Sequence, residues 1–159
     1  MTRHTFGPAP RKPLRLIARN PVYQAFARKP MPKSLQATQA IDVRLSYAAA
    51  IAGVAIRIDR EALAGMANCV MVLAEKHCIA ADLEAAQAAQ MALLRADGRA
   101  MQGKTWNFDG EGRTALLVAM DLFEDMVARL GQGAVTDALL TVLERAAKGQ
   151  VHRVELTHA

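Results

Sequence analysis

The chain is poor in aromatic residues, cysteine and long apolar runs, and each shortage excludes a class of protein. Aromatics make up 4% of the 159 residues although 52% are hydrophobic, so alanine, leucine, methionine and valine supply most of the apolar surface. Such a composition favours packed helices over sheets. No apolar run reaches the roughly 18 residues of a membrane span, and two cysteines are too few for a disulfide framework. Nothing at the N-terminus resembles a secretion signal, so we expect a cytoplasmic helical protein.

Proline is missing after Pro32, and acidic residues are missing throughout residues 1–33. All six prolines and eight basic residues fall within residues 1–33, which leaves residues 34–159 with a net charge of −3. Proline excludes regular helix, so we expect an extended or disordered arm, with one short helical turn as an option around residues 22–27. The basic residues of this arm that are candidates for binding nucleic-acid phosphates or an acidic protein are Arg11, Lys12, Arg15, Arg19, Arg28, Lys29 and Lys33.

An arginine-rich, acid-poor start also fits an organelle transit peptide. The prolines interrupt the amphipathic helix that such a peptide needs, so this alternative is disfavoured.

Residues 34–150 predict one compact bundle of about five helices, followed by a short tail at 151–159. Ser34 and Asp59 are candidate caps of the first two helices, and glycines end the last two. The expected helices run approximately over residues 34–51, 59–78, 83–96, 113–130 and 135–148. The expected inward faces include Leu35, Ile41, Leu45 and Ala48 in the first helix, Leu116, Met120, Phe123, Val127 and Leu130 in the fourth, and Leu139, Val142, Leu143 and Ala146 in the fifth.

Gly98–Thr105 has the spelling of a nucleotide-binding phosphate loop, G-x-x-x-x-G-K-[ST]. That motif needs a strand before it and a helix directly after its Lys-Ser/Thr pair. Here a helical pattern precedes the glycines, and Trp-Asn-Phe-Asp-Gly follows them. The apolar stretch ending at Asp121 imitates a magnesium-binding partner strand but begins too soon after Thr105 for a crossover helix. A glycine-bearing loop between helices is the favoured interpretation, with nucleotide binding as a remote alternative.

The residues after this loop suggest structural roles. Asn107, Asp109 and Glu111 match the start of a calcium loop, but Val118 stands where the bidentate glutamate belongs. Asp109 or Glu111 is better explained as the cap and first-turn acid of the fourth helix. Trp106 and Phe108 are then expected to fold back as an apolar plug that seats this helix.

The remaining polar residues give no sign of catalysis or of a metal site. Cys69 and the His77–Cys78 pair are separated by about 13 Å along a helix, too far to share one metal ion. The acids Asp121, Glu124 and Asp125 lie on the outer face of the fourth helix, where they form a solvated surface or meet a basic partner. We therefore predict no enzymatic activity, no metal and no cofactor.

The order of features from Pro21 to Lys148 resembles a group of small helical proteins encoded by prophages and plasmids of proteobacteria. The matching signals are Asn-Pro-Val at residues 20–22, helices near residues 63–73 and 83–101, the Gly-Lys-Thr-Trp-Asn-Phe-Asp-Gly-Glu sequence of residues 103–111, and the apolar helix with Met-Asp-Leu-Phe-Glu at residues 120–124. Members of the group carry a Thr-Gly-Arg-Trp-type sequence at the helix entry and no phosphate loop. The resemblance therefore implies that Lys104 and Thr105 are incidental and that the chain is an accessory protein of a mobile element.

Together these features predict a non-enzymatic protein that binds a host or phage macromolecule, for example as an inhibitor or regulator. A protein partner is slightly favoured because residues 34–159 are acidic, whereas nucleic-acid binders usually carry positive charge on the folded face as well. A DNA-binding regulator that uses the basic arm is the alternative. Self-association into a homodimer is a further option, and a membrane partner is not expected.

Overall fold

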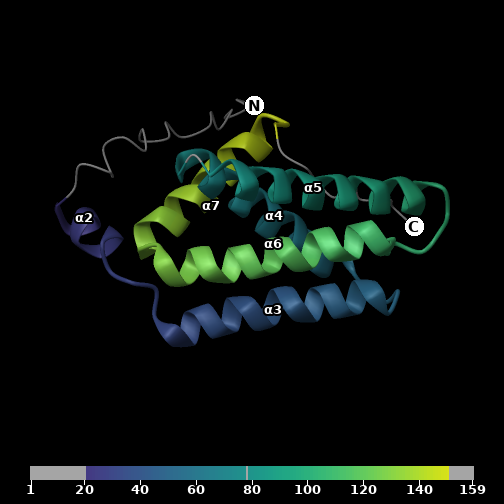
Figure 1. Ribbon diagram of the computed structural model, residues 1–159, viewed down its shortest axis with the longest axis horizontal. Helices are drawn as coiled ribbons and strands as arrows, with labels where there is room; N and C mark the ends of the chain where they lie inside the picture. The colour runs from purple at the N-terminus through teal and green to yellow at the C-terminus, as the bar shows by residue number, and fades with distance from the viewer. Residues whose placement is uncertain (1–20, 78, 151–159) are drawn as a thin grey trace, which may run out of the picture.

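A computed structural model describes residues 21–77 and 79–150, and within them the chain forms six helices and no strand of a sheet. The helices are α2 (Pro21–Ala27), α3 (Lys33–Ile51), α4 (Arg57–His77), α5 (Ala80–Met101), α6 (Gly110–Arg129) and α7 (Gln132–Ala147). Short connections join the five successive helices from α3 through α7, which form a helical bundle (Figure 1). The predicted all-α class and the five predicted body helices are confirmed.

α4 is the central helix because it packs against α3, α5, α6 and α7. Every residue from Met66 to Ala74 is buried, and a helix that is apolar around its whole circumference is stable only inside a core. One polar side chain lies in this stretch, and Gln90 Nε2 donates a hydrogen bond of 2.7 Å to Asn68 Oδ1. This bond ties α4 to α5 at one register, since an unpaired buried amide would be costly.

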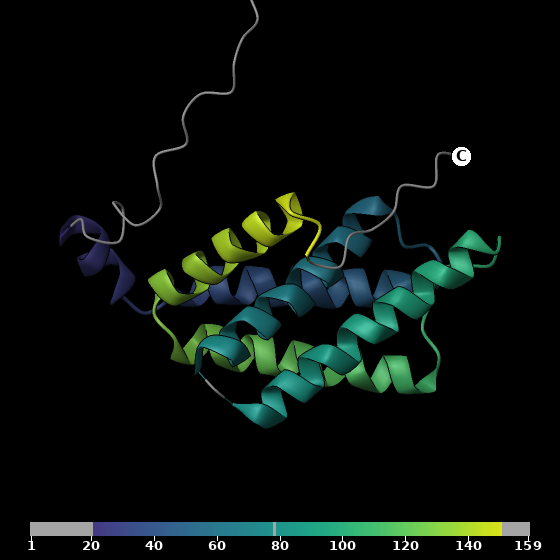
Figure 2. The ribbon, with the colours of Figure 1, turned by 90° about the horizontal axis from the view of Figure 1, so that it is seen from above.

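α5 packs against α6, and α6 lies between α5 and α3 in Figure 1, whereas Figure 2 shows that α5 crosses α6 obliquely. α5 buries mainly small residues, Ala86, Ala89, Ala92 and Ala96 with Leu93, which lets its neighbours approach closely. α6 buries the predicted face, including Leu116, Met120, Phe123 and Val127. Gly98, expected to break the helix before it, lies inside α5 instead. A single glycine costs only about 1 kcal/mol in a helix, which burial of the alanine face offsets.

The expected inward faces of α3 and α7 are wrong in part. Ile41 and Leu45 of α3 are 57% and 63% exposed, and the buried side of this helix carries Val43, Ser46 and Ala50. Leu143 of α7 is 65% exposed. Leu35 and Leu139 are also exposed, while Val135, Ala138 and Val142 form the buried side of α7. Both helices carry apolar residues on two sides, so periodicity alone does not select the buried one.

Residues 21–33 are folded in part rather than extended throughout, and the short helical turn offered as an option around residues 22–27 is confirmed. Residues 21–27 form α2, which packs against α7, and Met31 is buried. The Gln132 backbone N–H donates 2.8 Å to the Lys29 carbonyl, and a Cβ at Gly133 would collide with Ala27. Proline favours the first position of a helix, so Pro21 starts α2 rather than preventing it. The folded unit therefore begins before residue 34, and residues 1–20, 78 and 151–159 lie outside the described residues.

Candidate protein-interaction surfaces

The predicted acidic face lies on α6, where all three of its carboxylates form ion pairs. Arg44 of α3 reaches across to both Asp121 Oδ1 (2.8 Å) and Glu124 Oε1 (2.7 Å). Asp125 pairs with Arg129 one turn further along α6, at 2.6 Å. Three acids facing two arginines leave this surface with about one negative charge. The face is thus a mixed-charge rim rather than a purely acidic patch.

The Arg44 cluster also fixes α3 against α6. Hydrogen bonds to Glu124 and then Asp121 raise the pKa of the Arg44 guanidinium above its ordinary value. The Asp121 side chain remains 71% exposed and can exchange its partner without losing a buried contact. Exposed ion pairs of this kind contribute only about 0–1 kcal/mol to stability, so a binding partner can compete for these carboxylates.

An apolar groove lies between α3 and α6 beside this rim, with a volume of about 400 Å³. Its floor includes Phe123 and Val127, and its edges carry Lys33 on one side and Glu124 on the other. The remaining lining residues are Gln36, Ala37, Ala40 and Ala128. An apolar centre within a charged rim is the usual composition of a protein–protein contact site.

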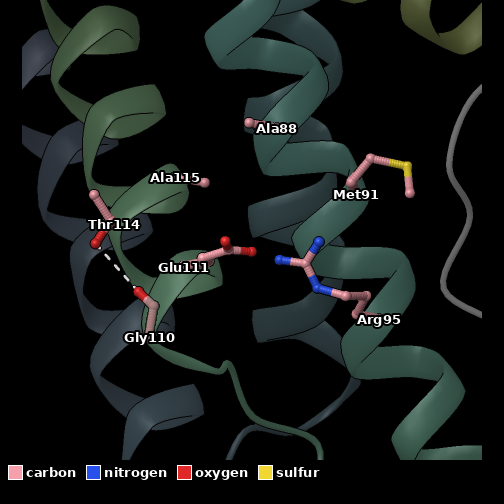
Figure 3. Close-up of a pocket in the computed structure, with 7 residues that line it drawn as sticks. All are labelled: Ala88, Met91, Arg95, Gly110, Glu111, Thr114 and Ala115. Carbon is pink, nitrogen blue, oxygen red and sulfur yellow. Dashed lines mark hydrogen bonds between the residues drawn. The ribbon is translucent and has the colours of Figure 1, made fainter.

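A second groove of about 500 Å³ separates α5 from the start of α6, with Met91 and Arg95 on the α5 side and Glu111 on the α6 side (Figure 3). Arg95 and Glu111 point toward each other across the opening in Figure 3. Arg95 also pairs with Asp109 at 3.2 Å, so its charge is already partly compensated. The lining is completed by Ala88, Gly110, Thr114 and Ala115. This groove offers a shallow apolar surface with a neutralised polar end.

The α5–α6 connection is seated by its two aromatic residues, as the sequence suggested. Trp106 and Phe108 are both buried, with their rings edge to face and 5.0 Å between centroids. The Trp106 indole N–H donates to Asp97 at 2.5 Å, and the Arg60 guanidinium lies 5.2 Å from the centre of the Trp106 ring. Phe108 stacks on Tyr47 of α3. The two aromatic side chains join α3, α4 and α5 at the entry to α6 and are not available to a ligand.

Asp109 caps α6, one of the two residues predicted for this role. Its Oδ1 accepts a hydrogen bond of 2.7 Å from the Gly112 backbone N–H. That bond, followed by the Arg95 contact, lowers the pKa of the Asp109 carboxyl. Glu111 lies in the first turn. Among the described residues, no three His, Cys, Asp or Glu side chains come together in a way that could hold a metal ion.

The phosphate-loop spelling has a different structure from the nucleotide-binding motif. Gly98 lies within α5, which continues to Met101, and Gly103 adopts a φ of 73° in the turn after it. Lys104 and Thr105 are exposed, and α6 begins at Gly110 rather than directly after them. The helix before the turn and the delay before the next helix prevent backbone amides from converging on one phosphate as the motif requires.

Three of the seven predicted arm residues fall within the described part of the chain. Arg28, Lys29 and Lys33 are exposed around the start of α3. They lie at the same end of the bundle as the α3–α6 groove, since Lys33 lines it. Arg11, Lys12, Arg15 and Arg19 lie outside the described residues.

Sequence reasoning missed the outer side of α3. Ser34, Thr38, Ile41, Leu45, Ala48 and Ala52 are all exposed, and none of them carries a charge. A signal was present, because α3 has apolar residues at two sets of helical spacings rather than one. The more hydrophobic of these two sets was expected to face the core, but it faces outward.

The described part of the chain is an all-α bundle with candidate interaction surfaces on α3, α5 and α6. None of the helices within residues 21–77 and 79–150 combines the length and the apolarity needed to cross a bilayer. No family model matches the chain, and neither the curated proteins nor the solved structures include one that is significantly similar to it.

Proposed function

We propose that this chain is a non-enzymatic, cytoplasmic accessory protein of a mobile genetic element that binds a host or phage protein. The observation that carries the proposal is the α3–α6 groove, which combines the buried Phe123 and Val127 with one basic residue, Lys33, and one acidic residue, Glu124, in its lining. A protein segment with apolar residues at its centre and charges at its edges matches this surface. Binding there would let the chain act as an inhibitor or regulator.

The charges around the groove favour protein over nucleic acid. Lys33 is the basic residue of the lining, while Glu124 lines the groove and Asp121 and Asp125 lie on the same helix. A phosphate backbone placed here would face these carboxylates, which oppose it even when they are ion-paired. A partner protein can instead supply arginine or lysine to Asp121, whose carboxylate is largely exposed.

A matched pair of substitutions tests the groove. Ala128→Arg introduces a long charged side chain into the α3–α6 groove, and Ala88→Arg makes the same change in the α5–α6 groove. Immobilised parent chain should retain a defined host or phage protein after nuclease treatment. Ala128→Arg should reduce that recovery at least tenfold, while Ala88→Arg should leave it unchanged. Equal recovery by all three chains would remove the groove from the binding site.

DNA binding through the basic N-terminal segment is the second candidate, favoured by eight basic and no acidic residues in residues 1–33. A binder that uses six or more phosphate contacts loses about 10³-fold or more in affinity between 50 and 200 mM salt. Anisotropy of a labelled DNA duplex measures this loss. The DNA proposal predicts steep salt dependence that disappears when Arg11, Lys12, Arg15 and Arg19 are changed to glutamine. Partner recovery abolished by nuclease would favour this candidate over the protein partner.

Nucleotide binding through Gly98–Thr105 is the remote third candidate. We expect no rise in melting temperature with ATP or GTP, and the same melting curve for Lys104→Ala. A nucleotide-dependent rise that Lys104→Ala removes would contradict this expectation.

A further inference from the structure

The outer seam of α3, defined as Ser34, Thr38, Ile41, Leu45, Ala48 and Ala52, follows the spacing of a coiled-coil contact. Its residues are separated by alternating steps of four and three, which keeps them in one line along a helix. The two largest, Ile41 and Leu45, occupy the middle of the line and are each more than half exposed. The smaller residues occupy its two ends.

The fold of one chain does not account for this seam. α3 is held to the bundle by its opposite side, through Val43, Ser46 and Ala50, and by the Arg44 ion pairs to α6. The exposed apolar surface continues past the end of α3 into Val54, Ile56 and Ile58, each at least 64% exposed. Charged side chains, Asp42 beside Ile41 and Arg57 between Ile56 and Ile58, flank these exposed apolar residues. Exposed apolar residues with a polar border usually mark a contact with another molecule.

We propose that the outer seam of α3 joins two copies of this chain, packed antiparallel about a two-fold axis midway between Ile41 and Leu45. Ile41 of one copy then faces the partner's Leu45, and Leu45 faces the partner's Ile41. At the ends, Thr38 faces the partner's Ala48 and Ser34 faces the partner's Ala52. The seam is therefore self-complementary in size, with large side chains opposite large ones and small opposite small, as an isologous contact requires.

Charge favours the antiparallel over the parallel arrangement. Arg28, Lys29 and Lys33 all lie around the start of α3. A parallel pair would bring the two sets of like charges together, whereas an antiparallel pair separates them by roughly 28 Å, the length of a 19-residue helix. The antiparallel pair also places Leu35 of each copy near the apolar Val54–Ile58 end of the other. Nucleic acid or a charged peptide would find no complementary charge on the seam.

The area of the contact sets the expected strength. A helix about 28 Å long and about 12 Å wide covers roughly 340 Å² per copy, or about 700 Å² for the pair. The two symmetric contacts of Leu35 with the Val54–Ile58 end bring the total near the lower limit of specific interfaces, about 1,000 Å². The dimer should therefore depend on concentration and dissociate within the micromolar range.

Sedimentation equilibrium of the full chain tests the proposal. The mass should rise from 17.2 kDa toward twice that value as the concentration increases from about 1 μM to about 1 mM. Ile41→Glu with Leu45→Glu should keep the chain monomeric throughout. The matched control, Leu139→Glu with Leu143→Glu, places the same charges on exposed leucines of α7 and should dimerise like the parent. Circular dichroism should show the same helicity for all three chains.

The milder pair Ile41→Ala with Leu45→Ala keeps the test decisive if the glutamates disturb folding, and it should weaken dimerisation at least tenfold. A parent mass of 17.2 kDa at every concentration would overturn the proposal. Dimerisation of either seam variant with the affinity of the parent would overturn it as well, because another surface would then join the copies.

Cysteine cross-linking tests the orientation, in chains whose Cys78 is replaced by serine. A mixture of Ile41→Cys and Leu45→Cys chains should form the disulfide-linked heterodimer, because these positions face each other in the antiparallel pair. Either variant alone should form little dimer, since its two thiols are offset along the helix axis by about 6 Å in addition to the distance between helices. Efficient cross-linking of each variant with itself would indicate a parallel pair and refute the antiparallel register.

Discussion

Phe108 offers the sharpest test of how the entry to α6 is held in place. Its ring is buried between Tyr47, stacked at 6.3 Å with an interplanar angle of 8°, and Trp106, which meets it edge to face. Replacing a buried phenylalanine with alanine usually costs about 3–5 kcal/mol, because transfer energy is lost and a cavity remains. Aromatic pairs add about 0.5–1.5 kcal/mol each. We predict a loss of about 4 kcal/mol for Phe108→Ala.

The matched variants separate volume from ring geometry. Phe108→Leu fills most of the cavity but loses both ring contacts, so its cost should be about 1–2 kcal/mol. Leu143→Ala removes an exposed leucine and should change stability by no more than about 0.5 kcal/mol. The loss of stability should therefore be largest for Phe108→Ala, smaller for Phe108→Leu and smallest for the control Leu143→Ala, because Phe108 is buried and stacked.

Urea unfolding measures these values, with the sole tryptophan, Trp106, as a fluorescent reporter and circular dichroism as a second probe. At about 2 kcal/mol per molar urea, Phe108→Ala should lower the midpoint by about 2 M. Chain concentrations near 1 μM keep the proposed dimer out of the measurement. A shift below about 0.5 M for Phe108→Ala would refute the interpretation of Phe108 as the residue that seats α6.

Three further predictions concern a cap, a thiol and the docking of α2. The pKa of Asp109 in the folded chain lies below its ordinary value of 3.8. The stability that this carboxylate provides is therefore present above pH 3.8 and is lost as the pH falls through the lower folded value. Between pH 5 and pH 2, the urea midpoint of Asp109→Asn should decline less steeply than that of the parent chain. Burial raises the pKa of the Cys69 thiol to about 12. In a chain whose Cys78 is replaced by serine, a thiol reagent at pH 8 should therefore react with Cys69 only as the chain unfolds. Reaction of the folded chain at the rate of the unfolded chain would contradict this. Gly133→Ala should displace α2, because the added methyl group meets Ala27, and trypsin should then cut the α2–α3 connection faster than in the parent; an unchanged rate would show that α2 is not held there.

The sequence specified the helices better than it specified their orientation. A proline-free stretch rich in alanine and leucine predicts helices through local preferences alone, and Asp109 was recognisable as a cap by its position before α6. Which side of α3 faces inward depends instead on long-range partners. Arg44 selects it by reaching two acids about 80 positions later in the chain, a contact that no local pattern reveals. The Tyr47–Phe108 stack acts in the same direction.

Long-range contacts that no local pattern reveals also explain why α2 is folded. Seven residues that begin with proline are too few for a stable isolated helix, so local reasoning offered a helical turn at residues 22–27 only as an option within an extended arm. The helix gains its support from the turn between α6 and α7, where glycines let the two backbones approach within hydrogen-bonding distance. Gly131 and Gly133 could be recognised as a helix stop from the sequence, but not as a docking site for a segment more than 100 positions earlier.

The α3–α6 groove and the outer seam of α3 lie on neighbouring sides of one helix, and this arrangement determines which substitutions are informative. Ala37 lines the groove and lies one helical turn from Ile41, so a bulky residue there would disturb both proposed contacts and separate neither. Ala128 belongs to α6 and affects the groove alone, whereas Leu45 belongs to the seam alone. If dimerisation and partner binding are independent, Ala128→Arg should abolish partner recovery without lowering the dimer mass, and the Ile41–Leu45 double substitution should do the reverse. Loss of both by either variant would show instead that the partner recognises the dimer.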